Sequence, residues 1–590
     1  MKKILALVLC AVMLLGPLSS CTTLVGDDKG AEIDIYLSGE IYDFDPTTGF
    51  EDVSKSKYLS LIFEGLTRLD ENGNWEYALM DEYDIVQDDE ECFKIDVTLR
   101  ETKWSDARRV QANDVVYAWK RILDPEFKCE AGSLLYDIKN AYDVKMGDAS
   151  IDDLGASAID TYILEIEFEK KIDLDEFFKK CASIALVPLR EDIVSINPNW
   201  AKKASTLITN GPFDIKELKT GEMTRLERSA YYYRDTSENG ALDEYVIPYR
   251  LRTHYDYGDL DEQLEAFLSG KIFYVGEIPL DRREEFAEYA NVSDYPATHA
   301  YYFNEKNPLF ENENVRRALS IALDREEIAK IVYYASPATG FVPPIVKDVA
   351  SDTYFRDGAG DLIQTTADLS GAKDLLRSAG VTEGEFSISI RDREVDYAVA
   401  EYAKGVWEQL GFTVRIERLS YATDAENSTI VIDKFGEAYL NGDYDVIAVD
   451  AISLATDPSE MLATFAKKYS GYGVNMEPED ERDENGEEVY NYDLKTHSTG
   501  FDDPEYEALF DEYFAEEDVA AKTDVLRRAE KMLIDKGVVA PLYFMKDSFL
   551  FSDILSKLDS IYFGRRFNGM KMDNYMAYKA DAEELSDEDE

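Results

Sequence analysis

An export signal occupies the N-terminus of this chain, which begins MKKILALVLCAVMLLGPLSSC. Two lysines supply positive charge, an apolar stretch follows, and small residues precede the cleavage site, which is the pattern of a signal peptide. The apolar stretch is shorter than the roughly 20 residues that a membrane-spanning helix needs, and Gly16-Pro17 interrupts it. We therefore expect an exported protein from which segment 1–20 is removed, with no permanent transmembrane helix.

The end of this segment, Leu18-Ser19-Ser20-Cys21, resembles a bacterial lipobox, in which the cysteine is joined to diacylglycerol and becomes the new N-terminus. Two or more acyl chains hold a protein stably on a membrane, at about 0.8 kcal/mol per buried CH₂. We expect Cys21 to be lipidated and residues 21–30 to form a tether. The protein would then lie on the outer face of the bacterial cytoplasmic membrane, in a periplasm or outside a single-membrane cell. The alternative is an ordinary cleaved signal with Cys21 merely nearby.

The size and charge of the remaining chain limit its architecture and its partners. Removal of 20 residues from 590 leaves 570, more than one simple core usually supports, so two or more lobes are expected. The formal net charge is −58, from 121 acidic and 63 basic residues. Such a field repels nucleic acid and anionic lipid headgroups. We expect no nucleic-acid partner, and most of the acidic surface serves to keep the protein soluble.

Cysteine and histidine are too sparse to indicate a metal or redox site. After the signal and Cys21, only Cys92, Cys129 and Cys181 remain, so at most one disulfide can form. Their spacing matches neither a CxxC motif nor a zinc pattern. The three histidines lie far apart without ligand-like partners at short spacing. The sequence predicts no cofactor and no metal.

Catalytic motifs are also missing from the sequence. It has no GxSxG elbow, no GxxxxGK[ST] loop and no HExxH helix. Paired carboxylates are so frequent in this acidic chain that no pair stands out as an acid and base. We expect a protein that is not an enzyme. The alternative is a surface hydrolase. Catalytic turnover that a single carboxylate mutation abolishes would favour this alternative.

Local patterns predict several helices and strands. YLSLIFEGLTRLDENGNWEYAL indicates a helix that runs into a hairpin with its turn at Asn72-Gly73. FKIDVTL alternates as a strand with one apolar face. Asn113-Asp114 are expected to cap a helix that Pro125 ends. For Trp104 and Trp119, core packing is favoured over contact with a ligand.

These segments resemble the extracellular solute-binding proteins of peptide ABC transporters, the oligopeptide/dipeptide/nickel-binding family. The chain has FEGL at 63–66, KWSD at 103–106 and TNGPF at 209–213. The most specific block is VRRALSIALDREEI followed by TGFVPP, within 301–344. Further motifs follow in family order, and the resemblance covers nearly the whole mature chain. KWSDA replaces the family's KWSDG, a departure that affects a turn.

The resemblance implies an α/β, periplasmic-binding-protein-like two-lobe fold with an additional inserted domain and a two-strand hinge. By motif, lobe I would comprise 31–75, 210–298 and 547–590. The inserted domain would be 76–209 and lobe II 299–546. A ligand that touches both lobes would stabilise a closed state.

The resemblance also implies a function: capture of oligopeptides by a lipid-anchored monomer and their delivery to an ABC permease. In peptide-binding members the ligand lies extended and pairs with main-chain groups. Two alternatives keep the fold, a surface sensor of a signalling peptide and a receptor for a non-peptide solute. Nickel is disfavoured because no histidine cluster is present.

Two stretches align with the pocket-forming parts of the family, one before the FEGL helix and one after GDYDV. The first is equally consistent with a solvated loop. The residues expected to contact ligand are Glu51, Asp52, Val53, Asp450, Ser453, Leu454 and Asp457.

The second stretch departs from the family pattern. Peptide binders commonly have a Trp and then an Asp shortly before a DP or EP pair, and that Asp binds the free amine of the peptide. Here those positions are Ala451 and Leu454. A buried ammonium without a partner costs several kcal/mol, so another carboxylate must replace the Asp or the ligand lacks an amine there. Asp450 and Asp457 are the nearest candidates, and each is also explained as a turn or helix-cap residue.

Overall fold

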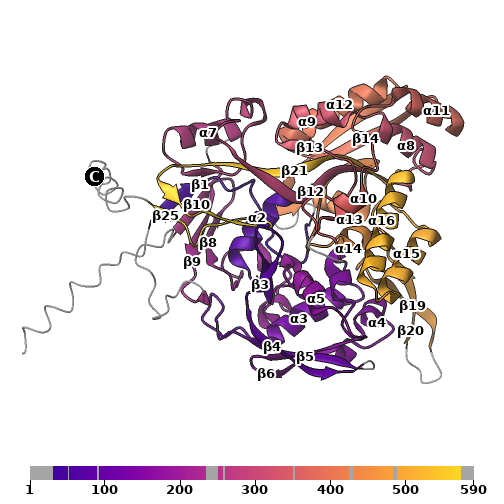
Figure 1. Ribbon diagram of the computed structural model, residues 1–590. Helices are drawn as coiled ribbons and strands as arrows, with labels where there is room; N and C mark the ends of the chain where they lie inside the picture. The colour runs from indigo at the N-terminus through magenta and orange to yellow at the C-terminus, as the bar shows by residue number, and fades with distance from the viewer. Residues whose placement is uncertain are drawn as a thin grey trace, which may run out of the picture.

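The computed structural model describes residues 31–50, 52–89, 92–233, 250–256, 259–349, 353–423, 431–482 and 488–572. The expected export signal, the tether with Cys21, and Glu51 lie outside these residues. Three large sheets organise the described chain, with helices around them (Figure 1). In the described part of the chain, no helix has both the length and the apolar character needed to cross a membrane.

The first sheet has four strands and includes the start of the described chain. Its order is β1-β10-β9-β8, and β1 pairs with β10 in parallel. Helix α2 (Val53–Ile62) packs against β8, and the hairpin of β2 (Thr67–Leu69) and β3 (Trp75–Tyr77) follows. The predicted helix and hairpin are thereby confirmed. The strands of the sheet are β1 (Glu32–Ile35), β10 (Arg250–His254), β9 (Met223–Arg228) and β8 (Phe213–Lys219).

The second sheet is antiparallel, with order β4-β5-β7-β6, and lies at the bottom of Figure 1. Strand β5 buries every second residue, as its sequence pattern predicts. Trp104 and Trp119 are both fully buried, so core packing is confirmed for them. The elements here are β4 (Met80–Asp88), β5 (Phe93–Leu99), β6 (Ala156–Asp160), β7 (Ile163–Phe168) and α3 (Ala112–Leu123).

The predicted cap of α3 is wrong by two positions. The helix begins at Ala112, and the N-cap residue is Gln111. The Asp114 carboxylate reaches back to accept the Gln111 backbone N–H at 2.9 Å and also accepts the Trp104 indole N–H at 2.9 Å. A carboxylate at the third helical position satisfies an N–H group that the helix itself leaves unpaired.

The third and largest sheet has the order β11-β21-β12-β18-β14-β15, with β13 paired to β21. Strands β12 and β21 have 13 residues each and pair antiparallel. Figure 1 shows them running from the region of β1 and α7 to the helices at the upper right. The strands are β11 (Tyr274–Val275), β12 (Asn291–Phe303), β13 (Ala335–Pro337), β14 (Gly384–Arg391), β15 (Phe412–Leu419), β18 (Val446–Ile452) and β21 (Val539–Phe551).

Helices cover this sheet and fill the space toward the second sheet (Figure 1). They are α7 (Leu260–Leu268), α8 (Glu313–Ile321), α9 (Arg325–Val332), α11 (Leu369–Ala379), α12 (Glu394–Glu408), α13 (Lys434–Asn441), α14 (Ser459–Ala463), α15 (Pro504–Ala515) and α16 (Val519–Asp535). Lys170, from the segment after β7, donates to the carbonyls of Phe514, Ala515 and Glu516 at the end of α15. The second sheet is therefore tied to the C-terminal helices.

Candidate ligand-binding site

Two pockets lie between separate parts of the chain. We call the first the hinge pocket. It has about 700 Å³ of empty space, part of it open to solvent, and includes Val53 and Lys57 of α2 and Tyr543 and Asp547 of β21. We call the second the acidic pocket. It has about 400 Å³ of empty space, part of it open to solvent, and its carboxylates are Glu130, Asp450 and Glu460.

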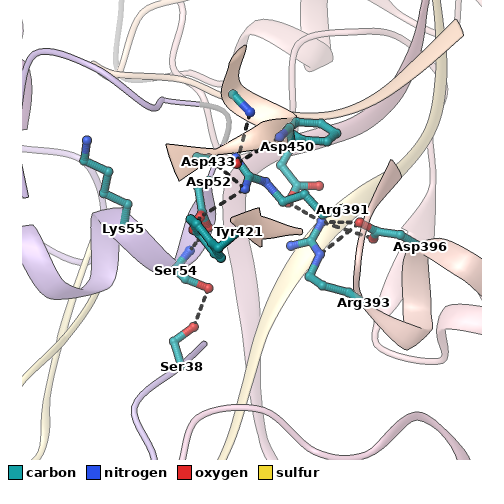
Figure 2. Close-up of polar contacts among 12 residues, drawn as sticks. Ser38, Asp52, Ser54, Lys55, Arg391, Arg393, Asp396, Tyr421, Asp433 and Asp450 are labelled. Atoms are coloured by element: carbon teal, nitrogen blue, oxygen red, sulfur yellow. Dashed lines mark hydrogen bonds and ion pairs between the residues drawn. The ribbon is translucent and has the colours of Figure 1, made fainter. Parts of the chain in front are cut away.

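Asp52 connects α2 to the opposite side of the site. It is the N-cap residue of α2, and its Oδ1 accepts the Ser54 backbone N–H at 2.9 Å. Its Oδ2 lies 3.6 Å from Nη1 of Arg391 and accepts the Tyr421 hydroxyl at 3.4 Å (Figure 2). Arg391 ends β14 and also contacts Asp433 Oδ2 at 3.1 Å. A helix cap on one side of the site is thus held by a guanidinium and a phenol on the other.

Asp450 lies in a second polar network, and both of its oxygens are engaged. Oδ2 accepts from Arg393 at 2.9 Å, and Oδ1 lies 2.6 Å from Nδ1 of His299 (Figure 2 shows the Arg393 contact). Arg393 also forms a two-pronged pair with Asp396 at 2.9 and 3.0 Å. The His299 ring stacks on Tyr543, with centroids 4.8 Å apart. The acid is therefore part of the folded network before any ligand arrives.

Electrostatics keep Asp450 ionised although it is fully enclosed. Burial raises the pKa of its carboxyl, but the charge of Arg393 and the hydrogen bond from His299 outweigh burial and hold this pKa below its usual value. A carboxylate that is already paired with Arg393 and hydrogen-bonded to His299 has little left for a ligand ammonium. Asp450 lines the acidic pocket, but it does not offer a free carboxylate.

The other residues expected from sequence fall into different places. Val53 lines the hinge pocket, and Leu454 is buried in the wall of the acidic pocket. Ser453 is buried, and its hydroxyl donates to the Ala455 carbonyl at 2.7 Å. Asp457 Oδ1 accepts the Ser459 backbone N–H at 2.8 Å, so this residue caps the turn before α14. The structure thus brings Asp450 and Leu454 into one pocket with neither Ser453 nor Asp457 in its lining.

Glu460 is the member of the site that the sequence analysis missed. Its side chain is buried in the acidic pocket, and Oε1 accepts the backbone N–H of Leu454 at 2.5 Å. Oε2 has no hydrogen-bond partner among the described residues. Burial, and then the charge of Asp457, raises the pKa of Glu460 well above its usual value. The signal in the sequence is an isolated glutamate before the apolar run MLATFA.

Glu130 approaches the acidic pocket from the segment of the second sheet. Its Oε1 accepts hydroxyl groups from Tyr439 at 2.7 Å and from Tyr472 at 2.6 Å. The aromatic rings of the pocket lining belong to Phe50, Tyr302, Phe341 and Tyr439. Carboxylates and rings from three separate parts of the chain therefore enclose one small space.

Metal and disulfide chemistry find no support in the described residues. Within those residues, no group of three or more His, Cys, Asp and Glu side chains is arranged to hold a metal ion. Cys92, Cys129 and Cys181 are each unpaired.

Comparisons with known proteins identify a family and several relatives that this chain resembles. The model of the bacterial extracellular solute-binding proteins, family 5 (middle region), matches residues 76–473. The dipeptide-binding protein DppE of Bacillus subtilis is 26% identical over 521 residues, which cover 85% of this chain and 84% of DppE.

Solved structures show the same two-lobe fold, so the expected α/β fold class is confirmed. OppA of Listeria monocytogenes bound to peptide superimposes with a TM-score of 0.74 at 21% identity, covering 92% of this chain and 99% of that one. For the murein tripeptide binding protein MppA of Escherichia coli, one structure gives a TM-score of 0.73 at 19% identity, covering 92% of this chain and 98% of that one. The unliganded open form of MppA gives only 0.54 at 20% identity, with 92% and 97% covered.

Proposed function

The chain belongs to the bacterial extracellular solute-binding proteins of family 5, and from this premise we propose that it is the substrate-binding component of an ABC importer. It captures oligopeptides between its lobes and delivers them to a permease in the membrane. DppE is named as a dipeptide-binding protein, and the OppA structure from Listeria monocytogenes holds a peptide, which supports this ligand class. The family consists of transport proteins and not of enzymes, so the proposal requires no bond to be made or broken.

One observation carries the proposal: both pockets are shared between separate parts of the fold. The hinge pocket has walls from α2 and from β21, and the acidic pocket joins Phe50 and Glu130 to β18. A ligand in either pocket therefore touches both sides at once. Such a ligand favours the closed arrangement by the contacts that it gains only there.

The division of the chain into lobes is part of the same proposal. Lobe I comprises 31–75, 210–298 and the segment from 547, lobe II comprises 299–546, and 76–209 is the inserted domain. The first sheet is built from the lobe I ranges, and the second sheet lies wholly within 76–209, which supports this division. Strands β12 and β21 each cross a proposed boundary, so they are the two strands of the hinge.

The described arrangement corresponds to the closed state in this proposal. Its likeness to the peptide-bound OppA exceeds its likeness to the open form of MppA, with TM-scores of 0.74 and 0.54. The contact between Asp52 and Arg391 spans the two lobes and requires them to be close. Lipidation of Cys21 would hold the monomeric protein on the membrane beside the permease.

Native mass spectrometry tests the function directly. The chain from residue 22 onward is purified from a peptide-rich medium, weighed under gentle conditions, and its ligands are sequenced after denaturation. The control is the same protein stripped in denaturant, refolded and exposed to a defined tryptic digest. We expect a ladder of bound masses that resolves into short peptides. A single discrete non-peptide mass in the purified sample, with no peptide bound by the stripped control, would contradict a peptide receptor.

A further inference from the structure

We propose that the acidic pocket binds a positively charged group of the ligand, an ammonium or a guanidinium, with Glu460 as its counter-ion. The inference rests on the proposed function, because it assumes a ligand held between the lobes. It goes beyond that function by stating the charge that the ligand must present and the residue that recognises it.

The position of Glu460 is fixed by the fold. It belongs to the first turn of α14, and the Leu454 backbone N–H holds one of its oxygens in place. The side chain is only 3% exposed, and the second oxygen has no partner among the described residues. A buried polar atom without a partner is unfavourable, and more so if it is charged. A ligand donor in the pocket would remove this penalty.

The charge of the pocket points to a cation as that donor. Its lining includes three carboxylates, and no Lys, Arg or His is found among its described lining residues. Asp450 is already paired with Arg393 and His299, and one Glu130 oxygen accepts two tyrosine hydroxyls. Among these three carboxylates, Glu460 is the one with a buried oxygen that has no hydrogen-bond partner in the described residues.

Lys128, two residues before Glu130, has partners outside the acidic pocket. Its Nζ donates to the Leu440 carbonyl at 2.5 Å and lies over the Tyr472 ring, 4.2 Å from its centroid. Burial lowers the pKa of Lys128 to about 8, so this lysine is still mostly protonated at neutral pH. Lys128 is not among the lining residues of the pocket.

The aromatic rings of the pocket suit a cation as well. Phe50, Tyr302, Phe341 and Tyr439 contribute rings to the same lining. The face of an aromatic ring attracts ammonium and guanidinium groups, and more strongly when they are buried. Carboxylate and rings together therefore recognise one charged group of a longer ligand.

Titration calorimetry with matched tripeptides tests this inference. The probes place lysine, or its neutral isostere norleucine, at each of the three positions of an alanine tripeptide, with a free or an acetylated N-terminus. A hydrogen bond to a charged group is worth about 1.5–3 kcal/mol, which corresponds to about tenfold or more in affinity. We expect the wild type to prefer a charged probe by at least tenfold and Glu460→Gln to reduce that preference to about twofold or less.

The probe set also identifies the source of the charge. A preference lost only on acetylation assigns the pocket to the terminal amine, and a preference for lysine over norleucine at one position assigns it to a side chain. Glu305→Gln is the control, because burial also raises the pKa of Glu305, to about 7, and Glu305 lies outside both pockets. This control should keep the full preference.

Failure of the inference is distinguishable from failure of the proposed function. Equal affinity of the wild type for charged and neutral probes, or an undiminished preference in Glu460→Gln, would overturn the cation site while peptide binding remains. Absence of binding by the wild type to every probe and to the digest would overturn the proposed function and with it the cation site. Glu460→Gln keeps an oxygen that accepts the Leu454 N–H, and a thermal melt of the variant checks that it is folded.

Discussion

Asp52 and Arg391 face each other across the site, with Oδ2 of the carboxylate 3.6 Å from Nη1 of the guanidinium. Asp52 begins α2 and Arg391 ends β14, so 339 positions of sequence separate them. Both side chains are largely buried. A contact of this kind exists only while the proposed lobes are together, so it stabilises the closed state relative to the open one.

Asp52→Asn should weaken ligand binding by about three- to tenfold. The charge that attracts Arg391 is lost, whereas an asparagine still caps α2. The expected range corresponds to about 0.6–1.4 kcal/mol, as for a modest, partly screened ion pair. Titration calorimetry with a peptide identified by mass spectrometry measures the change. Asp433→Asn is the control, because it removes an Arg391 partner from the same lobe. Equal weakening in both variants would exclude a specific role for the contact between lobes.

Arg393→Met should destabilise the protein by about 3 kcal/mol or more. The substitution leaves Asp396 and Asp450, both buried, without their shared cation, and a buried charge without its partner is strongly destabilising. Chemical denaturation gives the free energy of unfolding. The control is Arg415→Gln, which breaks an ion pair to Glu385 that is exposed on both sides. This control should change stability by less than about 1 kcal/mol. A similarly small loss of unfolding free energy in Arg393→Met would show that the network around Asp450 contributes little to stability.

The stability of the ligand-free protein should depend on the titration of Glu460. Its folded pKa is raised well above the usual value of 4.5 by burial and by Asp457. This group therefore contributes full stability below about pH 4.5, and the contribution is lost as pH rises through the folded pKa. Asp450, Glu130 and Tyr562 are the other titratable groups near Glu460.

Glu460→Gln lacks this titration, so its melting temperature should rise relative to wild type as pH increases from 4.5 to 8. Differential scanning fluorimetry across that range measures the difference. The same offset at every pH would mean that the pKa of Glu460 is the same in the folded and the unfolded protein. Addition of a cationic ligand should reverse the order at neutral pH, because only the wild type gains an ion pair.

Gly211→Ala should destabilise the protein by about 1–3 kcal/mol. A Cβ at this position would lie 2.4 Å from the backbone carbon of Ile62 and 2.6 Å from the Phe63 nitrogen, at the end of α2. Backbone atoms cannot move aside cheaply, so overpacking is expected. Gly405→Ala, where a Cβ meets nothing within 4 Å inside α12, should be neutral or stabilising by up to about 1 kcal/mol. Thermal melts give the melting temperatures of both variants. Equal melting temperatures would contradict the close approach of Gly211 to the end of α2.

Much of the local structure could be predicted because its causes are local. The strand at 93–99 follows from alternation of apolar residues, and the turn after Leu69 follows from Asn72-Gly73, where Gly73 has a φ of +74°. The predicted start of α3 is wrong because the Asp114 side chain does not cap the helix from its first position. It lies inside the first turn and accepts the backbone N–H of Gln111. Sequence alone does not rank such acceptors.

The site was only partly predictable because its contacts are long-range. Asp450 and Leu454 do line a pocket, but the partners of Asp450 lie 57 and 151 residues away in sequence. Glu460 is one of 121 acidic residues, and nothing in the local pattern marks it as buried. Its burial follows from α14 packing against the segment Glu130–Leu135, which only the folded chain reveals.

Small-angle X-ray scattering on peptide-stripped protein, before and after addition of the defined digest, tests the central claim that ligand is captured by closure of the lobes. We expect a smaller radius of gyration with peptide and a weaker response in Asp52→Asn at the same peptide concentration. Bound peptide with an unchanged radius of gyration would contradict capture by closure.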